Sequence, residues 1–501
     1  MKKSVIAWIS IGMMLACSHA KETEVTVSNE ERPNIIYIYA DDLGYGELGS
    51  YGQKKIKTPN LDRLAEEGIR FTQHYTSTPV CAPARYMLLT GRHGGHSFIR
   101  GNYELGGFAD ENEGGQMPLP ENTFTIGHML QNADYHTGVI GKWGLGFVNS
   151  TGEPNRQGFD YFYGYLDQKQ AHNYYPTHLW ENNEWDTLDN KYFKPRHRLE
   201  MAPEDPQVYD QFKGEDYAPE LMTAKALEFI DKNKDSPFFL YLPYTIPHVS
   251  LQVPENEYYK MYENQWDSIP YLGQMGYTPH PQPLAAYAGM ISTLDSYVGE
   301  IMRHIKDLGL DEKTIIMFSS DNGPTFNGGV NAGFFNSTAG LRGLKMDLYE
   351  GGIRVPFIAR WPGHIPKGKV TDHPSAQYDM MATLADLINV EAPDHDGISL
   401  LPTLLGQEGE QKQHEFLYFE YPEKGGQLAI RMGKWKGIKT GLKEEPEVLW
   451  EIYNLEEDPF ETTDLVKDHP ELVEKLDEIV KNEHLQATIR EWEIIHINET
   501  Y

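Results

Sequence analysis

Four short apolar runs, each followed at once by polar or charged residues, constrain the fold of this chain more than any other feature of its sequence. The runs occupy residues 35–40, 137–140, 238–242 and 314–318. Unbroken apolar runs of this length are typical of strands that are buried on both faces, as in a parallel sheet covered by helices. Segments with helical spacing lie between them, at residues 60–68, 123–132, 220–233 and 284–308. This alternation predicts an α/β fold with a mostly parallel central sheet.

The sequence pattern changes in the last fifth of the chain. Short apolar runs separated by turn residues predict antiparallel strands and one helix, at residues 416–421, 428–432, 435–438, 449–453 and 470–482. We therefore expect a large α/β domain at residues 32–400 and a smaller C-terminal α+β domain with an antiparallel sheet at 401–501. Residues 168–215 are polar, aromatic and poorly periodic, which predicts a long excursion at the mouth of a site.

The N-terminus has the pattern of a secretory leader, residues 1–20, in which lysines precede an apolar run too short to span a membrane as a helix. The stretch ending in Cys17 resembles a bacterial lipoprotein cleavage box, which would make Cys17 a lipidated N-terminus. Ordinary cleavage after Ala20 is the alternative. Residues 21–31 are polar and are interpreted as a linker. We expect an exported protein of the periplasm or cell surface, which contacts the membrane only where a lipid anchor is attached.

The charge of the chain excludes one class of partner. The formal net charge is −30, from 44 basic and 74 acidic residues. Nucleic acid is not expected as a partner, because the sequence carries no overall basic footprint. An acidic protein can still form a locally positive pocket, so a small anionic substrate is compatible with this composition.

Side chains that can hold a metal ion follow two of the predicted strands. Asp41 and Asp42 come directly after the first run, and Asp321 and Asn322 come shortly after the last. Ligands of α/β folds bind beyond the carboxyl ends of the strands. Carboxylate and amide oxygens suit Ca²⁺ or Mg²⁺ better than zinc. The alternative is turn chemistry, because Asp-Asp and Asp-Asn-Gly are common after any strand.

Cys81 is the only cysteine after the leader, so it has no intramolecular disulfide partner. A lone thiol is either an inert core residue or a chemical centre. Four cationic side chains follow at or near predicted strand ends and glycine-rich turns: Arg85, Lys142, His248 and Lys345. Each of them alone can equally be a solvated or structural residue.

Several motifs occur in a fixed order along the chain. The segment from Cys81 to Arg85 matches the pattern C-x-P-x-R, and Leu-Thr-Gly-Arg continues it at residues 89–92. Further matches are Pro33-Asn34-Ile35-Ile36 with Asp41-Asp42-Leu43-Gly44, Gly141-Lys142-Trp143, Pro247-His248, Asp321-Asn322-Gly323, and Gly343 with Lys345 and Tyr349-Glu350-Gly351-Gly352. On these motifs the chain resembles the formylglycine-dependent sulfatase family of the alkaline-phosphatase-like superfamily, in particular secreted bacterial glycan sulfatases. Each motif is weak alone, but six in order are specific.

The resemblance implies that a maturation enzyme converts Cys81 to formylglycine, whose hydrate presents two hydroxyl groups on one carbon. One hydroxyl attacks the sulfur of an anionic sulfate ester, an acid protonates the leaving alcohol, and the second hydroxyl then expels sulfate. The resemblance further implies that Asp41, Asp42, Asp321 and Asn322 hold Ca²⁺ together with the oxygen of residue 81.

The same resemblance implies roles for the four cationic side chains and makes residues 32–400 the catalytic domain. Arg85 would orient the hydrate. Lys142 and Lys345 would neutralise the sulfate oxygens, an electrostatic role worth about 3 kcal/mol per donor. His248 would be the general acid or a group that positions the sulfate.

One position departs from the family pattern G-K-W-H-x-G, because Gly144 stands where the pattern has histidine. By the resemblance, that histidine normally contacts the formylglycine hydroxyl. By residue type, His93, His96, His172 and His178 are candidates to replace it.

Residues 171–178 resemble the corresponding segment of sulfatases that act on sulfated galactose-type sugars. We therefore expect His172 and His178 near the sugar of a sulfated mono- or oligosaccharide, with loop histidines of no role as the alternative. Two other functions stay open. One is a phosphonate monoester or phosphodiester hydrolase, because relatives with this activity use the same cysteine pattern. The other is a catalytically silent protein that binds sulfated glycans, which Gly144 suggests and the intact Cys81 motif opposes.

Overall fold

The computed structural model describes residues 32–103, 105–106, 113–194, 196–445 and 448–495. The expected leader at 1–20, the lipidation site Cys17 and the linker at 21–31 lie outside the described residues. Within the described ranges, no helix is long and apolar enough to cross a membrane.

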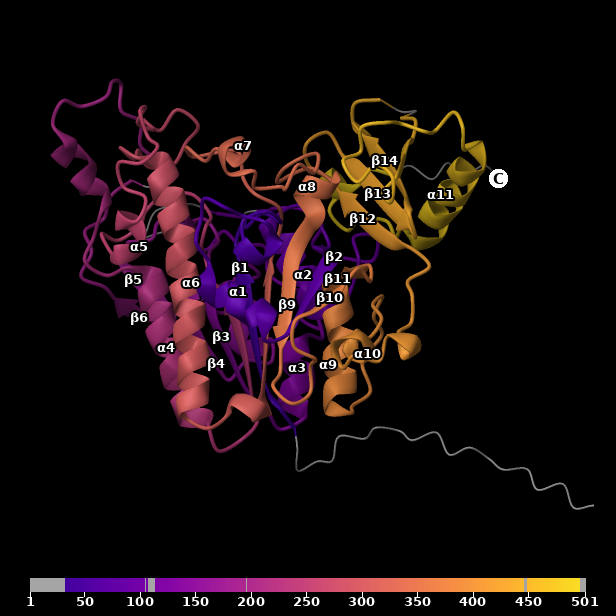
Figure 1. The fold of residues 1–501 in the computed structure, drawn as a ribbon, viewed down its shortest axis with the longest axis horizontal. Coiled ribbons are helices and arrows are strands. Elements are labelled where there is room, and N and C mark those ends of the chain that lie inside the picture. The colour runs from indigo at the N-terminus through magenta and orange to yellow at the C-terminus, as the bar shows by residue number, and fades with distance from the viewer. Residues whose placement is uncertain (1–31, 104, 107–112, 195, 446–447, 496–501) are drawn as a thin grey trace, which may run out of the picture.

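One large sheet runs through the molecule (Figure 1). Eleven strands of the described residues form it, in the order β10-β2-β9-β8-β1-β7-β3-β4-β5-β6, with β11 beside β2. The five strands from β8 to β4 in this order run parallel, whereas β9 and the β5–β6 hairpin are antiparallel to their neighbours. The strands are β1 (Asn34–Ala40), β2 (Ile69–Tyr75), β3 (His136–Lys142), β4 (Tyr161–Tyr165), β5 (His178–Glu181), β6 (Glu184–Thr187), β7 (Phe238–Pro243), β8 (Thr314–Ser320), β9 (Arg354–Arg360), β10 (Lys369–Thr371) and β11 (Ser375–Ala376).

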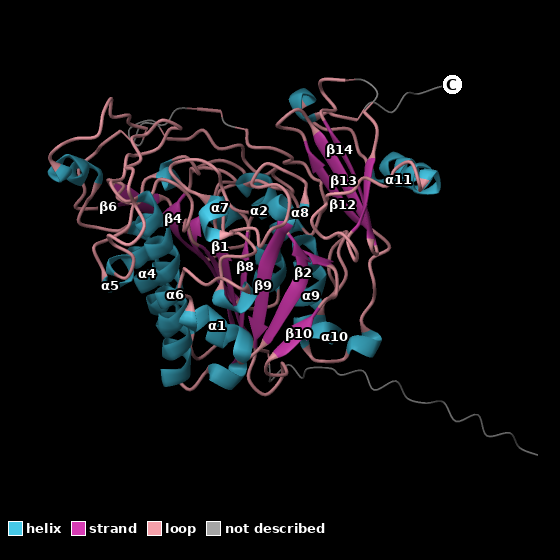
Figure 2. Ribbon diagram, turned by 45° about the horizontal axis from the view of Figure 1, so that its top comes forward, coloured by secondary structure: helices cyan, strands magenta, loops and turns pink. Residues whose placement is uncertain are grey.

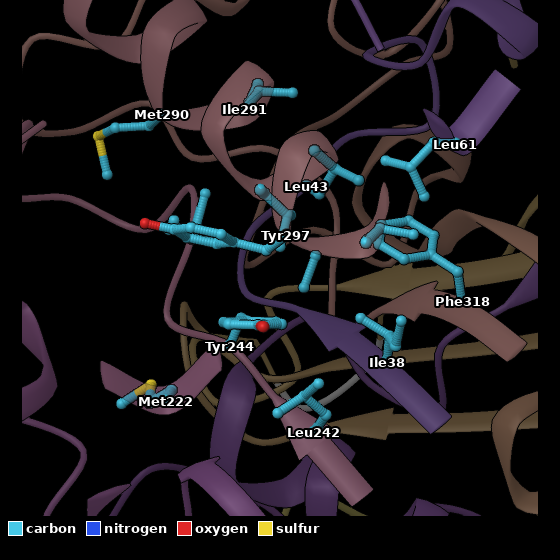
Figure 3. Close-up of a cluster of buried hydrophobic side chains, with 14 of the residues drawn as sticks. Ile38, Leu43, Leu61, Met222, Leu242, Tyr244, Met290, Ile291, Tyr297 and Phe318 are labelled. Atoms are coloured by element: carbon cyan, nitrogen blue, oxygen red, sulfur yellow. The ribbon is translucent and has the colours of Figure 1, made fainter. Parts of the chain in front are cut away.

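Helices cover both faces of this sheet. The helices of the described residues are α1 (Pro59–Glu66), α2 (Cys81–Thr90), α3 (Ile126–Asn132), α4 (Ala218–Asn233), α5 (Glu257–Lys260), α6 (Pro283–Asp307), α7 (Ala332–Phe335), α8 (Glu350–Ile353), α9 (Met380–Ile388), α10 (Leu401–Leu404) and α11 (Pro470–Glu483). Alternate residues of β1 point into two cores, because successive side chains of a strand face opposite sides. Ile36 and Ile38 pack with α1, α4 and α6, as Figure 3 shows for Ile38, whereas Ile35 and Tyr37 pack with α2, α3 and α9.

A second, four-stranded antiparallel sheet forms the C-terminal region, in the order β12-β13-β14-β15 (Figure 2). Its strands are β12 (Leu417–Tyr421), β13 (Gln427–Met432), β14 (Trp435–Thr440) and β15 (Glu451–Asn454). Leu472 and Leu476 of α11 pack on one face of it. Leu417 and Phe419 of β12 lie on the other face and pack against residues of the large sheet region, among them Tyr75.

The observed elements confirm the expected fold class, an α/β region with a mostly parallel sheet and a smaller C-terminal region with an antiparallel sheet. The predicted strands and helices are present with bounds shifted by a few residues. Several further elements were not predicted, among them β2 and α2. β2 carries polar residues at several positions and is only partly buried, and α2 is buried along its whole length, so neither shows a clear period.

Candidate active site

The carboxyl ends of β1 and β8 bring three carboxylates together. β1 and β8 are parallel neighbours with Ala40 opposite Ser320, so the residues that follow them lie side by side. Asp42 has a positive φ of 66° and donates its backbone N–H to Asp321 Oδ1 at 3.0 Å. Asn322 Nδ2 donates to Asp42 Oδ1 at 2.7 Å. The predicted metal-binding residues therefore form one buried cluster.

Three cations, Lys142, Arg85 and Lys345, surround these carboxylates. Lys142 Nζ, at the end of β3, lies 2.6 Å from Asp41 Oδ2. Burial alone would raise the pKa of Asp41, but Lys142, together with His248 and Arg85, holds it well below its usual range. Burial and the neighbouring Asp41 raise the pKa of Asp321 to about 7, although a guanidinium pairs with it. These three cations thus face the three carboxylates of the cluster.

The cluster fits a bound divalent cation. Asp41 Oδ1, Asp42 Oδ2 and Asn322 Oδ1 are buried and have no hydrogen-bond partner among the described residues. Buried polar atoms are almost always hydrogen-bonded, so three unpartnered oxygens in one cluster indicate a ligand. Asp41, Asp42, Cys81 and His248 each place a donor atom within 4.8 Å of the others. Hard oxygen donors of this kind suit Ca²⁺.

Cys81 is the first residue of α2 and is buried. Its sulfur lies 3.4 Å from Lys345 Nζ, which is also 2.6 Å from Asp42 Oδ1. Burial raises the pKa of the Cys81 thiol to about 11, even though Lys142 and Lys345 favour the thiolate. A thiol with this pKa is uncharged at neutral pH, and the uncharged form is a poor nucleophile. The unmodified cysteine is therefore badly suited to attack an ester.

Arg85 lies one helical turn after Cys81 on α2, on the same side of the helix. Its guanidinium donates to Asp321 Oδ2 and to the carbonyl oxygen of Lys142, both at 2.8 Å, and lies 5.5 Å from the centre of the Tyr39 ring. Asp321 and Asp41 raise the pKa of Arg85 further although burial opposes this, so the side chain is a fixed cation. It links the helix that carries Cys81 to the carboxylates Asp321 and Asp41.

Two stacked histidines close another side of the cluster. His248 Nε2 lies 3.6 Å from Asp42 Oδ2, and its ring stacks on His172 at 4.5 Å with an interplanar angle of 7°. Burial lowers the pKa of His248 to about 4, and burial with His248 lowers that of His172 well below its usual value. Tyr277, which sequence reasoning missed, packs edge-on against both rings, at 5.3 and 6.0 Å. No sequence motif marks this tyrosine.

The structure places the other candidate histidines away from this cluster. His178 Nε2, on β5, lies 2.8 Å from Glu113 Oε1, and its ring stacks on Trp185 at 3.8 Å. His93 and His96 stack on each other, and their ion pairs are with Asp396 and Glu483. None of these contacts involves Cys81 or the predicted metal-binding residues.

Comparison with known proteins gives consistent matches over the whole site. The chain matches the family described as Sulfatase over residues 33–390, and N-sulphoglucosamine sulphohydrolase, C-terminal, over 344–488. It is 30% identical over 532 residues to the N-acetylgalactosamine-6-O-sulfatase of Bacteroides thetaiotaomicron, covering 94% of this chain and 97% of the relative. It is 34% identical over 420 residues to human arylsulfatase A, covering 81% and 74%.

Among solved structures, Ps i-CgsB in complex with k-i-k-neocarrahexaose is similar to this chain with a TM-score of 0.74 and 28% identity, over 92% of this chain and 94% of that one. The first family match, over residues 33–390, contains every residue of the cluster described above.

Proposed function

The chain belongs to the sulfatase family and hydrolyses sulfate esters, and on that premise we propose that it acts on sulfated mono- or oligosaccharides through a formylglycine at position 81 and a bound Ca²⁺ ion. The observation that supports this most is the contact between Cys81 and Lys345 beside three unpartnered ligand oxygens. Buried donors of this type, next to a cysteine that is a poor nucleophile as it stands, suit a modified nucleophile activated by a cation.

The residues around position 81 have complementary tasks in this proposal. Lys142 and Lys345 bind the sulfate oxygens and offset their charge, and Arg85 orients the hydrate of residue 81. Asp41, Asp42, Asp321 and Asn322 hold the ion, which when bound would supply a Lewis acid beside residue 81. The hydrate supplies one hydroxyl to attack sulfur and a second to expel sulfate.

His248 is the proposed proton donor or sulfate-positioning group. Its Nδ1 lies against the carbonyl oxygen of Val249, so Nδ1 carries a proton and donates it in a hydrogen bond. Nε2 is then the atom that faces the site and exchanges a proton with the departing alcohol. Because burial lowers the pKa of His248 to about 4, Nε2 carries no proton in the free protein near neutral pH, so His248 acts as proton donor only where a bound anionic sulfate raises its pKa.

We propose a sulfated sugar of the galactose type as substrate, in line with the N-acetylgalactosamine-6-O-sulfatase and the carrahexaose complex among the similar proteins. His172 would contact the sugar that carries the sulfate ester, since it stacks on His248 beside Tyr277. His178 would act at a more distant sugar. It lies with the exposed Trp185 on the β5–β6 hairpin, and an aromatic ring there can stack on a sugar face.

The remaining proposals concern maturation, export and domain organisation. We propose that a formylglycine-generating maturation enzyme acts on Cys81, and that the protein is exported to the periplasm or cell surface, with Cys17 as lipid anchor where one is attached. We further propose that residues 32–400 form the catalytic domain and residues 401–501 the smaller second domain.

Peptide mapping by mass spectrometry of protein from a host with a maturation system tests the proposal. The peptide that contains residue 81 should carry an aldehyde, and the protein should release sulfate from sulfated galactose-type sugars. Cys81→Ser should lose turnover by at least about 10³-fold, because the nucleophile is removed. Full turnover with an unmodified thiol would contradict the proposal. Faster hydrolysis of phosphate diesters would favour the alternative activity, and no hydrolysis of any ester by converted protein would favour a silent binding protein.

A further inference from the structure

The side-chain oxygen of Gln168 is a buried polar atom outside the carboxylate cluster, and the proposed mechanism does not use it. Gln168 is only 5% exposed, and its side-chain Oε1 has no hydrogen-bond partner among the described residues. Its backbone N–H is satisfied by Gln116 Oε1 at 3.2 Å. A buried carbonyl oxygen without a donor is rare in folded proteins and asks for an explanation.

The orientation of this carboxamide follows from its neighbours. The backbone N–H of Ala82, the residue after Cys81, donates to Asn102 Oδ1 at 3.4 Å. That oxygen also accepts from Gln168 Nε2 at 3.4 Å. Since Ala82 offers only a donor, Asn102 must present its oxygen, and Gln168 must present its nitrogen to Asn102. The Oε1 atom is therefore turned away from Asn102, at the end of α2 that carries Cys81.

The unpartnered oxygen also lies against the departure from the family pattern. The backbone of Gly144 continues the β3–β4 pairing by donating to Leu166 O at 3.1 Å, which brings it beside residues 166–168. A Cβ built on Gly144 would have two described heavy atoms within 4 Å, Gln168 Cβ at 3.4 Å and Gln168 Oε1 at 3.7 Å. Gly144 has φ +72°, a conformation that a histidine adopts only with strain. Gln168 thus lies where the side chain of residue 144 would begin, and the backbone of Gly144 disfavours any such side chain.

We propose that Gln168 is a positioning residue for the reaction: its Oε1 accepts a hydrogen bond from a hydroxyl of converted residue 81 and fixes the direction of that hydroxyl. This inference rests on the proposed function. A carboxamide accepts a hydrogen bond but takes up no proton near neutral pH. Gln168 therefore orients the hydroxyl, and proton uptake is left to another group such as His248. None of the four candidate histidines is needed at position 144.

Two variants of Gln168 separate this role from simple space filling. Gln168→Met keeps the length of the side chain and removes the acceptor. In unconverted protein, from a host without the maturation enzyme, its melting temperature should equal or exceed that of the parent, because a buried unpaired oxygen is removed. In converted protein it should lower kcat by about 10- to 100-fold with little change in KM. Gln157→Met is the matched control, since Gln157 is buried with an unpartnered Oε1 but bonds to Thr151 near α3.

Gln168→Glu keeps an acceptor but makes it titratable. Its kcat, relative to that of the parent, should rise with pH as the carboxyl loses its proton, giving an acid limb that the parent lacks. An unchanged kcat in Gln168→Met, a loss that matches a fall in its melting temperature, or a pH-independent ratio for Gln168→Glu would each overturn the inference. The parent is first assayed on an aryl sulfate ester. A parent that carries the aldehyde but shows no turnover contradicts the proposed function, whereas parent turnover that Gln168→Met retains overturns this inference alone.

Discussion

Lys345 Nζ lies 3.4 Å from the sulfur of Cys81 and 2.6 Å from Asp42 Oδ1, so one ammonium group contacts both the nucleophile position and a metal-binding residue. The lysine comes from the loop before α8, 264 residues away from Cys81 in the sequence. Its backbone N–H donates to Pro324 O, in the loop that follows Asp321 and Asn322. The charge at the centre of the site is thus placed by contacts between distant loops.

Lys345→Met should reduce kcat/KM for a sulfate ester by about 10²- to 10³-fold, because it removes a buried cation that faces the reacting group. The measurement is steady-state sulfate release by converted protein, with aldehyde content checked by mass spectrometry. Lys424→Met is a matched control. Lys424 pairs with Asp347 and its side chain is 45% exposed, so its removal should leave activity within about twofold. Equal losses in the two variants would contradict the role of Lys345.

Calcium should stabilise the folded protein measurably. Removal of the ion with a chelator should lower the melting temperature, and Ca²⁺ at about 1,000 times its dissociation constant should restore about 4 kcal/mol of stability. Asn322→Ala should shrink this shift, because it removes one of three unpartnered oxygens. Asn327→Ala, on the same loop, should leave it unchanged. A melting temperature of the parent that does not respond to Ca²⁺ would contradict a calcium site at this cluster.

The parallel core of the fold could be predicted from the sequence because burial on both faces leaves unbroken apolar runs. β1 and β8 are examples, and every residue of both strands is buried. β2 could not be predicted in the same way. It pairs near the edge of the sheet and exposes Arg70 and Thr72 in part, which breaks the pattern. α2 is buried on all sides, so it lacks the one-sided apolar stripe by which helices are recognised.

The residues of the site also differ in how far the sequence could predict them. Asp41, Asp42 and Cys81 lie in local motifs, and the sequence indicated them correctly as neighbours of one cluster. Tyr277, beside His172 and His248, and Gln168, the proposed positioning residue, are placed by contacts between segments far apart in the chain, and no motif surrounds them. Gln168 lies beside Gly144 because β3 pairs with β4, and this pairing cannot be derived from the sequence alone.

A buried ion pair joins the C-terminal sheet to α8 and should be important for stability. Lys436 of β14 is 1% exposed, and its Nζ lies 3.0 Å from Glu350 Oε1 and 2.8 Å from Glu461 Oε1. Lys436→Met should cost about 3–5 kcal/mol, because it leaves the buried Glu461 without its cation and Glu350 with only the more distant Arg354 at 3.5 Å. Lys439→Met, on the same strand but in a partly exposed pair, should cost less than about 1 kcal/mol. Denaturant unfolding measures both, and similar midpoints for the two variants would contradict this account.

Acid should destabilise the protein in part through His74. Its ring is buried, stacks on Phe357 at 4.4 Å and bonds through Nδ1 to Ser375 Oγ at 2.9 Å. Burial lowers the pKa of His74 to about 3, so between pH 6.5 and 3 the unfolded chain binds a proton that the folded chain refuses. Stability from this group is full above pH 6.5 and falls as the pH drops, by about 2 kcal/mol at pH 5. Denaturant unfolding at pH 7.5 and pH 5 measures the fall in the free energy of unfolding between the two pH values. This fall should be about 2 kcal/mol smaller in His74→Gln than in the parent. In the control His469→Gln, at the start of α11, it should equal that of the parent. An unchanged pH dependence in His74→Gln would show that the buried ring is not one of the groups that set the acid limit.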